Sequence, residues 1–282
     1  MMNENKLPLL SVILPVHNSE HYVRDAIQSI LDQTYDNFEL LILISATTNR
    51  ESLDIINSFS DKRIRLIHRD PDENLPRSLN RGIQEAKGEY IARMDADDVS
   101  VRFRLKEQVR FMNEHPSIGI AGTWYKTIGT KQSYINKGFT DPEDIRANLL
   151  FNTSIAHPSV MLRKSFFDKF NLLYNPSLSY CEDYDLWARC SAYFPIANIS
   201  KVLLLYRIHE KSASHIHKEE IKDIASSVKL GLIKKLGLEP STEEIRIHNS
   251  LYPQEKENVE VFLKKEEDWL KKIIYANEQT NI

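Results

Sequence analysis

Three aspartates close together in the sequence have the residue type and spacing to do chemistry. Asp95, Asp97 and Asp98 directly follow an apolar run at residues 90–94. Because neighbouring carboxylates repel one another when they are buried without a counterion, this pattern favours a hard divalent cation, Mg²⁺ or Mn²⁺, which prefers oxygen ligands. With few protein ligands, such an ion has room to bind the oxygens of a diphosphate. The alternative is an exposed acidic turn that caps the helix expected from about residue 101.

The elements that must position these aspartates are predicted by the apolar pattern before them. Short apolar runs alternate with helical periodicity over the first part of the chain. The runs are residues 9–14, 38–44, 64–67 and 90–94, and the helical stretches are 22–31, 53–59 and 79–86. Uninterrupted apolar strands separated by amphipathic helices predict a parallel sheet covered on both faces. We therefore expect an α/β, doubly wound fold, whose ligands bind at the carboxyl ends of the strands.

Polar segments follow three of these strands. Parallel strands bring such segments to one edge of the sheet, so we expect a shared ligand site there. The segments are Pro15-Val16-His17-Asn18, Ser45-Ala46-Thr47-Thr48 and Asp95-Ala96-Asp97-Asp98.

The rest of the chain has a mixed order of elements. A helix is expected at about 102–114, short strands near 118–122, 134 and 160, a helix at 183–193 and a strand at 202–206. This order predicts that residues 1–98 and 99–217 are two halves of one domain, followed by a helical C-terminal extension at 218–282.

One apolar stripe runs through the last helical stretch of this extension. It consists of Val259, Phe262, Leu263, Trp269, Leu270, Ile273 and Ile274. We expect the stripe to pack on the parent domain. The alternative is peripheral docking on a membrane surface, assisted by the adjacent lysines.

The composition is that of an ordinary globular enzyme, with 282 residues, 41% hydrophobic and 27% charged. A net charge of −3 gives no field that favours nucleic acid. The spacing of Cys181 and Cys190 matches no metal site, and two thiols are too few for a disulfide framework. Residues 1–6 lack the apolar core of a signal peptide, and no run reaches the roughly 18 apolar residues of a membrane span. We therefore expect a cytoplasmic protein, with attachment at the inner face of the membrane as the alternative.

Five segments resemble, in order, the motifs of family 2 glycosyltransferases of the GT-A fold, over roughly residues 9–215. They are SVILPVHN at 11–18, LNRGI at 79–83 leading into GEYIARMDADD at 88–98, HPSVM at 157–161, CEDYDLW at 181–187 and YRIH at 206–209. The resemblance implies a GT-A type doubly wound, mostly parallel sheet flanked by helices. It also implies metal-dependent, inverting transfer of a sugar from a nucleotide diphosphate.

The resemblance further implies a role for each matching residue. The nucleotide-sugar donor would be bound by Pro15, Val16, His17, Asn18, Ser45, Arg81, Asp95, Ala96 and Asp97. The metal would be bound by Asp95, Asp97 and His209, where His209 can instead contact the diphosphate. Asp183 matches the catalytic base. His157, Glu182 and Arg207 would contact the acceptor or support the residues that bind the substrates. Arg207 or His209 could supply fixed positive charge to the leaving group.

Several of these residues also have plainer interpretations. Glu182 and Asp183 begin a predicted helix, where acids are common because of the helix dipole. His157 precedes a proline and could be an ordinary loop residue, and His209 belongs to a polar, histidine-rich segment.

The segment at Ser45 departs from the family pattern. Relatives carry aspartate after the second strand to read the base and the ribose, whereas here Ser45, Ala46 and Thr47 stand there. Ser45 or a backbone carbonyl could still accept the base N–H. The missing acid weakens the assignment of uridine as the base.

The sequence is therefore interpreted as a hexosyltransferase that uses a UDP-hexose or UDP-N-acetylhexosamine. Its acceptor would be a saccharide or lipid-linked oligosaccharide in surface polysaccharide biosynthesis. The alternative is a degenerate, non-catalytic module that binds sugar nucleotides. A phosphohydrolase with an Asp-x-Asp nucleophile is disfavoured, because that motif would follow the first strand rather than the fourth.

Overall fold

The computed structural model describes residues 7–210, 212, 216–250 and 257–280. The expectation for residues 1–6 therefore lies outside the described residues. One sheet runs through the protein in the order β3-β2-β1-β4-β8-β6-β9-β5, with β7 paired to β6. The strands are β1 (Leu10–Val16), β2 (Phe38–Ile44), β3 (Ile64–His68), β4 (Tyr90–Arg93), β5 (Val99–Ser100), β6 (Ile120–Ile128), β7 (Ile135–Asn136), β8 (Met161–Arg163) and β9 (Ile196–Arg207).

The four strands predicted from the first part of the chain are parallel neighbours, as expected. β1 lies between β2 and β4, and β2 pairs with β3. Beyond β4 the sheet becomes mixed, because β8 is antiparallel to both β4 and β6. β9 is then parallel to β6, and β5 is antiparallel to β9. Strands from both parts of the chain thus form one continuous sheet.

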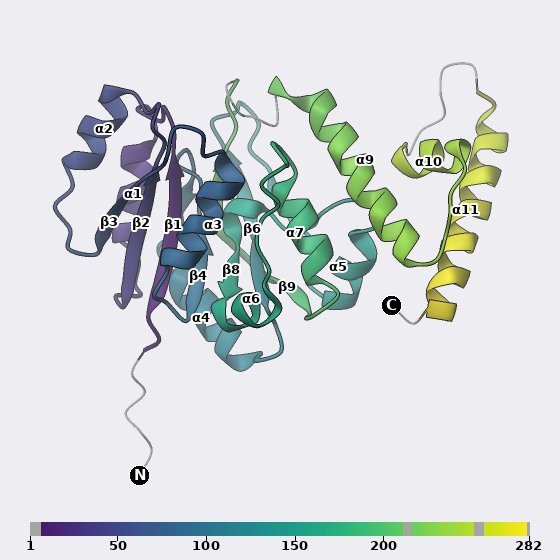
Figure 1. Cartoon of the computed structure of the whole chain (residues 1–282), viewed down its shortest axis with the longest axis horizontal. Helices are drawn as coiled ribbons and strands as arrows, with labels where there is room; N and C mark the ends of the chain where they lie inside the picture. The colour runs from purple at the N-terminus through teal and green to yellow at the C-terminus, as the bar shows by residue number, and fades with distance from the viewer. Residues whose placement is uncertain (1–6, 211, 213–215, 251–256, 281–282) are drawn as a thin grey trace, which may run out of the picture.

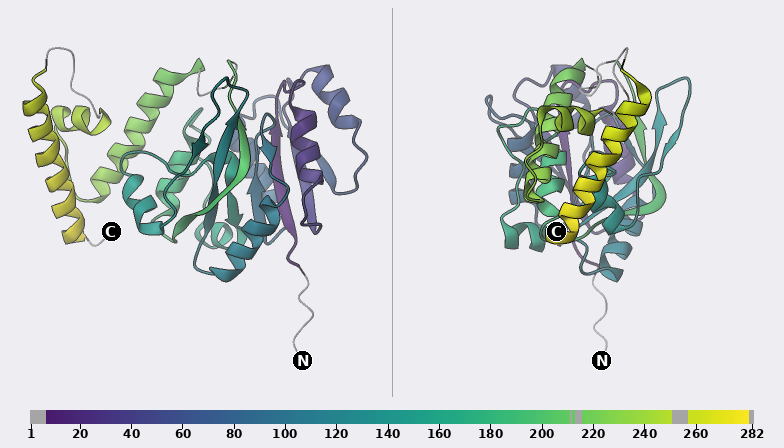
Figure 2. Two further views of the ribbon diagram at one scale, coloured as in Figure 1. Left: turned by 180° about the vertical axis from the view of Figure 1, so that it is seen from behind. Right: turned by 90° about the vertical axis from the view of Figure 1, so that its right-hand side faces the viewer.

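Helices cover both faces of the sheet, because successive strand residues point to opposite sides. Figures 1 and 2 show the two faces, with α3 and α7 on one and α1 and α4 on the other. Alternate residues of β1 and β2 enter the two hydrophobic cores that these helices close. The helices of this part are α1 (Val23–Leu31), α2 (Arg50–Asn57), α3 (Leu75–Glu85), α4 (Arg104–Glu114), α5 (Pro142–Asn148), the 3₁₀ turn η1 (His157–Ser159), α6 (Lys164–Phe170) and α7 (Glu182–Cys190).

Several element boundaries differ from the sequence prediction, among them the starts of α3 and β9. Helix α3 begins at Leu75 rather than at residue 79, because the Asn74 side chain accepts a hydrogen bond from the Arg77 N–H and Pro76 occupies the first turn. Strand β9 is longer than the predicted residues 202–206, because it pairs along the whole of β6 across a register shift at Thr123 and Trp124.

The C-terminal extension consists of α9 (Lys218–Lys235), α10 (Thr242–Asn249) and α11 (Val259–Thr280). α9 packs beside α7, and α10 and α11 lie at the end of the molecule away from β3 (Figure 1). The apolar stripe of α11 is divided. Phe262, Trp269 and Ile273 are buried in a third core that also contacts Leu150 and Phe151 of the main domain. The rest of the stripe is exposed, namely Val259, Leu263, Leu270 and Ile274. Among the described helices, none combines the length and the apolar character needed to cross a membrane.

Candidate active site

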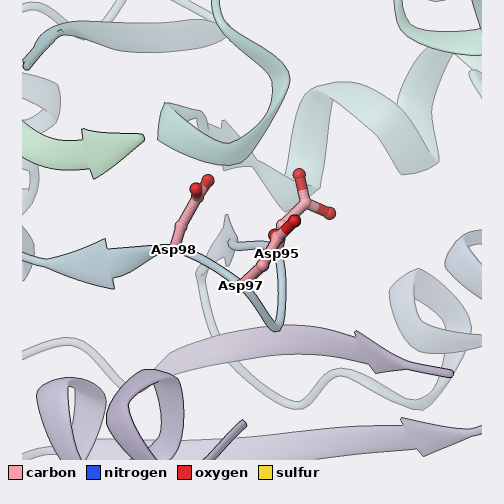
Figure 3. Close-up of side chains that lie close together, drawn as sticks. All are labelled: Asp95, Asp97 and Asp98. Atoms are coloured by element: carbon pink, nitrogen blue, oxygen red, sulfur yellow. The ribbon is translucent and has the colours of Figure 1, made fainter. Parts of the chain in front are cut away.

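Three carboxylates meet on the turn between β4 and β5. Asp95, Asp97 and Asp98 each have an oxygen within 4.8 Å of the others, and Figure 3 shows all three side chains projecting to the same side of the turn. The turn is fixed at its start, since the buried Arg104 donates from Nη2 to the Arg93 carbonyl over 2.7 Å. The sequence prediction of a carboxylate cluster at a strand end is thus realised in the fold.

Asp98 supplies the clearest sign of what the cluster can hold. Its Oδ1 accepts the Arg207 backbone N–H over 2.8 Å, while its buried Oδ2 has no hydrogen-bond partner among the described residues. Burial, with Asp95 and Asp97 nearby, raises the pKa of Asp98 to about 9. Buried polar atoms normally have partners, so an unpaired oxygen beside two other carboxylates fits a divalent cation with oxygen ligands.

Asp95 forms an ion pair with a buried arginine, Arg93, at the end of β4. Arg93 is 4% exposed and its Nη1 donates to Asp95 Oδ2 over 2.6 Å. Burial raises the pKa of the Asp95 carboxyl, and the guanidinium opposes that rise. Arg93 therefore supplies positive charge at the centre of an acidic site.

Asp97 is contacted by two residues near the end of β9. His209 Nε2 lies 2.9 Å from Asp97 Oδ2, and Arg207 Nε donates to the Asp97 carbonyl over 2.7 Å. The Arg207 guanidinium stacks on the Tyr22 ring at 4.7 Å, and the Tyr22 and His209 rings are 5.1 Å apart. These contacts join the end of β9 to the loop after β1, and they bring Arg207 and His209 next to Asp97.

One pocket of about 720 Å³ opens beside this group. Its lining includes His17, Asn18, Asp97, Arg207 and His209. Asn18 has a positive φ of 44°, which turns the chain sharply after β1, and its Oδ1 accepts the Asn49 N–H over 2.8 Å. The expected loop after the first strand therefore forms a wall of this pocket.

The residues next to this loop belong to β1 and to the segment after β2. Pro15 and Val16 belong to β1, and Val16 is buried. Ser45 Oγ lies 3.2 Å from Thr47 Oγ1, which in turn lies 3.4 Å from His17 Nδ1. The segment after β2 thus offers hydroxyl groups next to His17.

A second pocket, of about 690 Å³, also borders Asp97. Its lining includes Asp95, Asp97, Glu182, Asp183 and His157. Asp97 lines both pockets, so the two spaces adjoin at the carboxylate cluster, and the Glu182–Asp183 pair borders the same second pocket as Asp95 and Asp97. This is the juxtaposition on which the sequence interpretation depended.

Asp183 stands at the N-terminus of α7. The chain enters this helix through Cys181 in a left-handed conformation, with φ of 55°. The Tyr184 N–H donates to Asp183 Oδ1 over 2.8 Å. Burial nevertheless raises the pKa of Asp183, and burial beside Asp183 raises the pKa of Glu182 to about 7. A carboxylate with a raised pKa in a pocket is suited to act as a general base.

His157 belongs to a buried network behind these acids. Its Nε2 lies 2.8 Å from the Tyr174 hydroxyl, and its Nδ1 lies 3.6 Å from Glu182 Oε1. Burial and the Arg93 charge lower the pKa of His157 well below its ordinary value, so the imidazole is neutral. His157 therefore contacts Glu182 and lines the second pocket.

Arg81 is the predicted residue that lies apart from this group. Its Nη1 donates to the His68 carbonyl over 2.9 Å, and it lines a separate surface pocket with Asp70 and Glu73. Ala96 lies in the turn with its side chain buried. Sequence reasoning gave no role to Arg93, Tyr22 or Tyr174. The first of these carried a usable signal, since a charged residue inside an apolar strand needs a buried partner.

More than half of the chain matches a known family. The model for Glycosyl transferase family 2 matches residues 11–170. The O-antigen biosynthesis glycosyltransferase WbnJ of Escherichia coli is 33% identical over 217 residues, covering 73% of this chain and 82% of that protein. An uncharacterized glycosyltransferase of Haemophilus influenzae is 29% identical over 234 residues, covering 79% and 72%.

Solved structures share the fold. S. aureus TarS 1-349 in complex with UDP-GlcNAc superposes with a TM-score of 0.66 at 18% identity, covering 95% of this chain and 81% of that one. Mannosyltransferase PcManGT from Pyrobaculum calidifontis, in complex with GDP-Man and Mn²⁺, gives a TM-score of 0.57 at 13% identity, covering 98% and 88%. The expected GT-A type α/β fold is therefore confirmed. Together with the carboxylate turn and the acidic pair at the start of α7, these matches show that the chain belongs to glycosyl transferase family 2.

Proposed function

We propose that the protein is an inverting glycosyltransferase that moves a hexose or N-acetylhexosamine from UDP to a saccharide acceptor. The observation that carries this proposal is that Asp97 borders two pockets, one beside His17 and Asn18 and one beside Asp183. Transfer between two substrates requires two adjoining spaces that meet at the reacting carbon. The UDP-GlcNAc in the TarS complex supports a nucleotide-sugar donor.

The donor would occupy the first pocket. Its base and ribose would lie against His17 and Asn18, with the hydroxyls of Ser45 and Thr47 close by. Its diphosphate would lie toward Asp97, beside the Arg207 guanidinium and the His209 ring. Donors that are already oriented stabilise the charge that develops on a leaving group.

The carboxylate cluster would hold Mn²⁺ or Mg²⁺ through Asp95, Asp97 and Asp98, with His209 as a further contact. When bound, a divalent ion supplies charge neutralisation for the departing diphosphate. The unpartnered Oδ2 of Asp98 supports this fit, as does the Mn²⁺ in the PcManGT complex.

Asp183 would act as the base. Its carboxylate takes the proton of the acceptor hydroxyl while that oxygen bonds to the anomeric carbon and the bond to the diphosphate oxygen breaks. Attack opposite the leaving group inverts the anomeric configuration. Positioned general bases contribute about 10²–10⁴-fold to such reactions. His157 contacts Glu182, the sequence neighbour of Asp183, and would help to position the acidic pair.

The chain would work in surface polysaccharide biosynthesis, with a saccharide or a lipid-linked oligosaccharide as its acceptor. The relationship to the O-antigen enzyme WbnJ supports this setting. Residues 1–98 would form the donor half, residues 99–217 the acceptor and catalytic half, and residues 218–282 the extension. Work at the inner face of the membrane, with the exposed part of α11 as the contact, is consistent with such an acceptor.

A nucleotide-sugar panel with Mn²⁺ tests the proposal. Donor hydrolysis and transfer are measured for wild type, Asp183→Asn and the control Asp185→Asn, whose side chain pairs with Arg189 on the same helix. We expect Asp183→Asn to keep UDP affinity and lose turnover, while Asp185→Asn keeps both. Asp97→Ala should lose Mn²⁺-dependent UDP binding. Stabilisation of the wild type by UDP without turnover of any donor would instead favour a non-catalytic binding module.

A further inference from the structure

The pocket beside Asp183 is strongly acidic. Four carboxylates line it, from Asp95, Asp97, Glu182 and Asp183. Among the described residues of its lining, Arg93 is the one permanent cation, and it is already paired with Asp95 at 2.6 Å. His157, which also lines the pocket, is neutral because burial lowers its pKa. The described walls therefore carry an excess of carboxyl groups over permanent cations.

The substrates of the proposed reaction leave this excess in place. A divalent ion at Asp95 and Asp97 would be offset by the negative charge of the diphosphate that accompanies it. Asp183, which is ionised when it acts as the base, then still faces the acceptor, and its charge repels a second anion. Like charges brought together at a binding surface weaken binding, so a carboxylate or phosphate on the entering sugar would be disfavoured.

Part of the pocket lining is apolar and aromatic. It includes Ile221 and Ala225 of α9, the first helix of the C-terminal extension. Tyr180 also lines the pocket, and its ring stacks on His217 just before α9, with ring centroids 4.6 Å apart. Cys181 Sγ donates to the Ile221 carbonyl over 3.4 Å, which fixes α9 against the start of α7.

These walls match the two kinds of surface on a neutral sugar ring. Hydroxyl groups can donate to carboxylates, and the C–H faces can pack against aromatic and aliphatic side chains. The cavity, of about 690 Å³, is within the range of roughly 300–1,000 Å³ that small-molecule pockets span.

Building on the proposed function, we propose that the sugar that enters this pocket as acceptor is uncharged, with neither carboxylate nor phosphate, and that α9 forms the wall against which it packs. Any charged part of a larger acceptor lies outside the pocket.

The proposal is tested with pairs of related sugars in which one member is neutral and the other carries a carboxylate or a phosphate. Methyl β-glucoside is compared with methyl β-glucuronide, methyl β-galactoside with methyl β-galacturonide, and N-acetylglucosamine with its 1-phosphate. Binding to the full chain is measured by ligand-observed NMR, with and without UDP and Mg²⁺. We expect the neutral member of at least one pair to bind at least tenfold more tightly than its charged counterpart. Equal or tighter binding of the charged members, or no binding by any probe, would overturn the proposal.

A positive charge introduced on α9 at the pocket tests the assignment of this wall independently. Ala225→Lys should reduce the discrimination between glucoside and glucuronide at least fivefold. The control Ser227→Lys adds the same charge to an exposed position of the same helix, outside the pocket lining, and should leave the discrimination unchanged. An identical effect of both variants would contradict the assignment of the wall. UDP titration of the same samples separates this result from a failure of the proposed function, which would appear as absent nucleotide binding.

Discussion

Replacing Arg93 with methionine should affect stability and cation binding in opposite directions. Methionine keeps much of the side-chain volume and removes the charge that is paired with Asp95. Breaking a buried ion pair by removing one partner costs about 3–5 kcal/mol. The Arg93 side chain is 4% exposed, but that of Asp95 is 32% exposed. Because water can solvate the unpaired Asp95 carboxylate, we expect a loss of stability at the lower end of this range, about 3 kcal/mol. At about 2–4 °C per kcal/mol, the melting temperature should fall by about 6–12 °C.

The same substitution should strengthen the response to Mn²⁺. Arg93 occupies Asp95 Oδ2 in the wild type, so its loss frees that oxygen for a cation and removes a competing positive charge. A tenfold tighter site adds about 1.4 kcal/mol of stabilisation at saturating ion. The assay is thermal unfolding of the wild type and the variant, with and without Mn²⁺.

Arg163→Met is the matched control for this experiment. Arg163 is also buried, but it donates to the carbonyl oxygens of Ile118, Met112 and His115. This variant should lose stability while its increment with Mn²⁺ stays that of the wild type. If Arg93→Met melted within 2 °C of the wild type, or gained no more from Mn²⁺ than Arg163→Met, the account of the acidic centre would be wrong.

Three further substitutions test the acidic pair and the packing of the fold. Folding raises the pKa of Glu182 from 4.5 to about 7. The contribution of this group to stability is therefore complete below pH 4.5 and is lost as the pH rises through 7. Glu182→Gln should raise the melting temperature by a few degrees at pH 8 and have little effect at pH 5. Trp269 Nε1 donates to buried His248 Nδ1 over 3.1 Å, so Trp269→Phe should cost about 1–3 kcal/mol in urea unfolding, and an unchanged midpoint would argue against that bond. At Gly88 a Cβ would lie 2.4 Å from the Ser11 backbone nitrogen, so Gly88→Ala should cost about 3 kcal/mol, and wild-type stability would show that this approach relaxes freely.

The parallel strands were largely predictable because their sequences are mostly apolar. Residues 38–44 show this directly, since every residue of β2 is buried and Glu39 is its one charged residue. The two-residue strand β5 could not be found in this way, because its place depends on pairing with Leu204 and Leu205 of β9, far along the chain. The start of α3 was missed because Asn74 and Pro76 determine it through capping rather than through periodicity.

The candidate site was predictable where strand ends determine position. Asp95 and Asp97 follow β4, and parallel topology alone brings them to the edge where β1 ends. Arg81 was assigned from motif resemblance, and the turn of α3 carries it to another surface. The roles of α9 and of Tyr174 depend on contacts between distant segments, such as the bond from Asn80 to the Tyr174 carbonyl, and local sequence does not encode these.

The most direct test of the central claim is a crystal structure with UDP and Mn²⁺, with anomalous data that locate the ion. The account requires a Mn²⁺ peak coordinated by Asp97 and the diphosphate, in the space that opens onto Asp183. A peak at another place, or UDP bound with its diphosphate away from Asp97, would contradict the claim that the two acidic groups serve one transfer site.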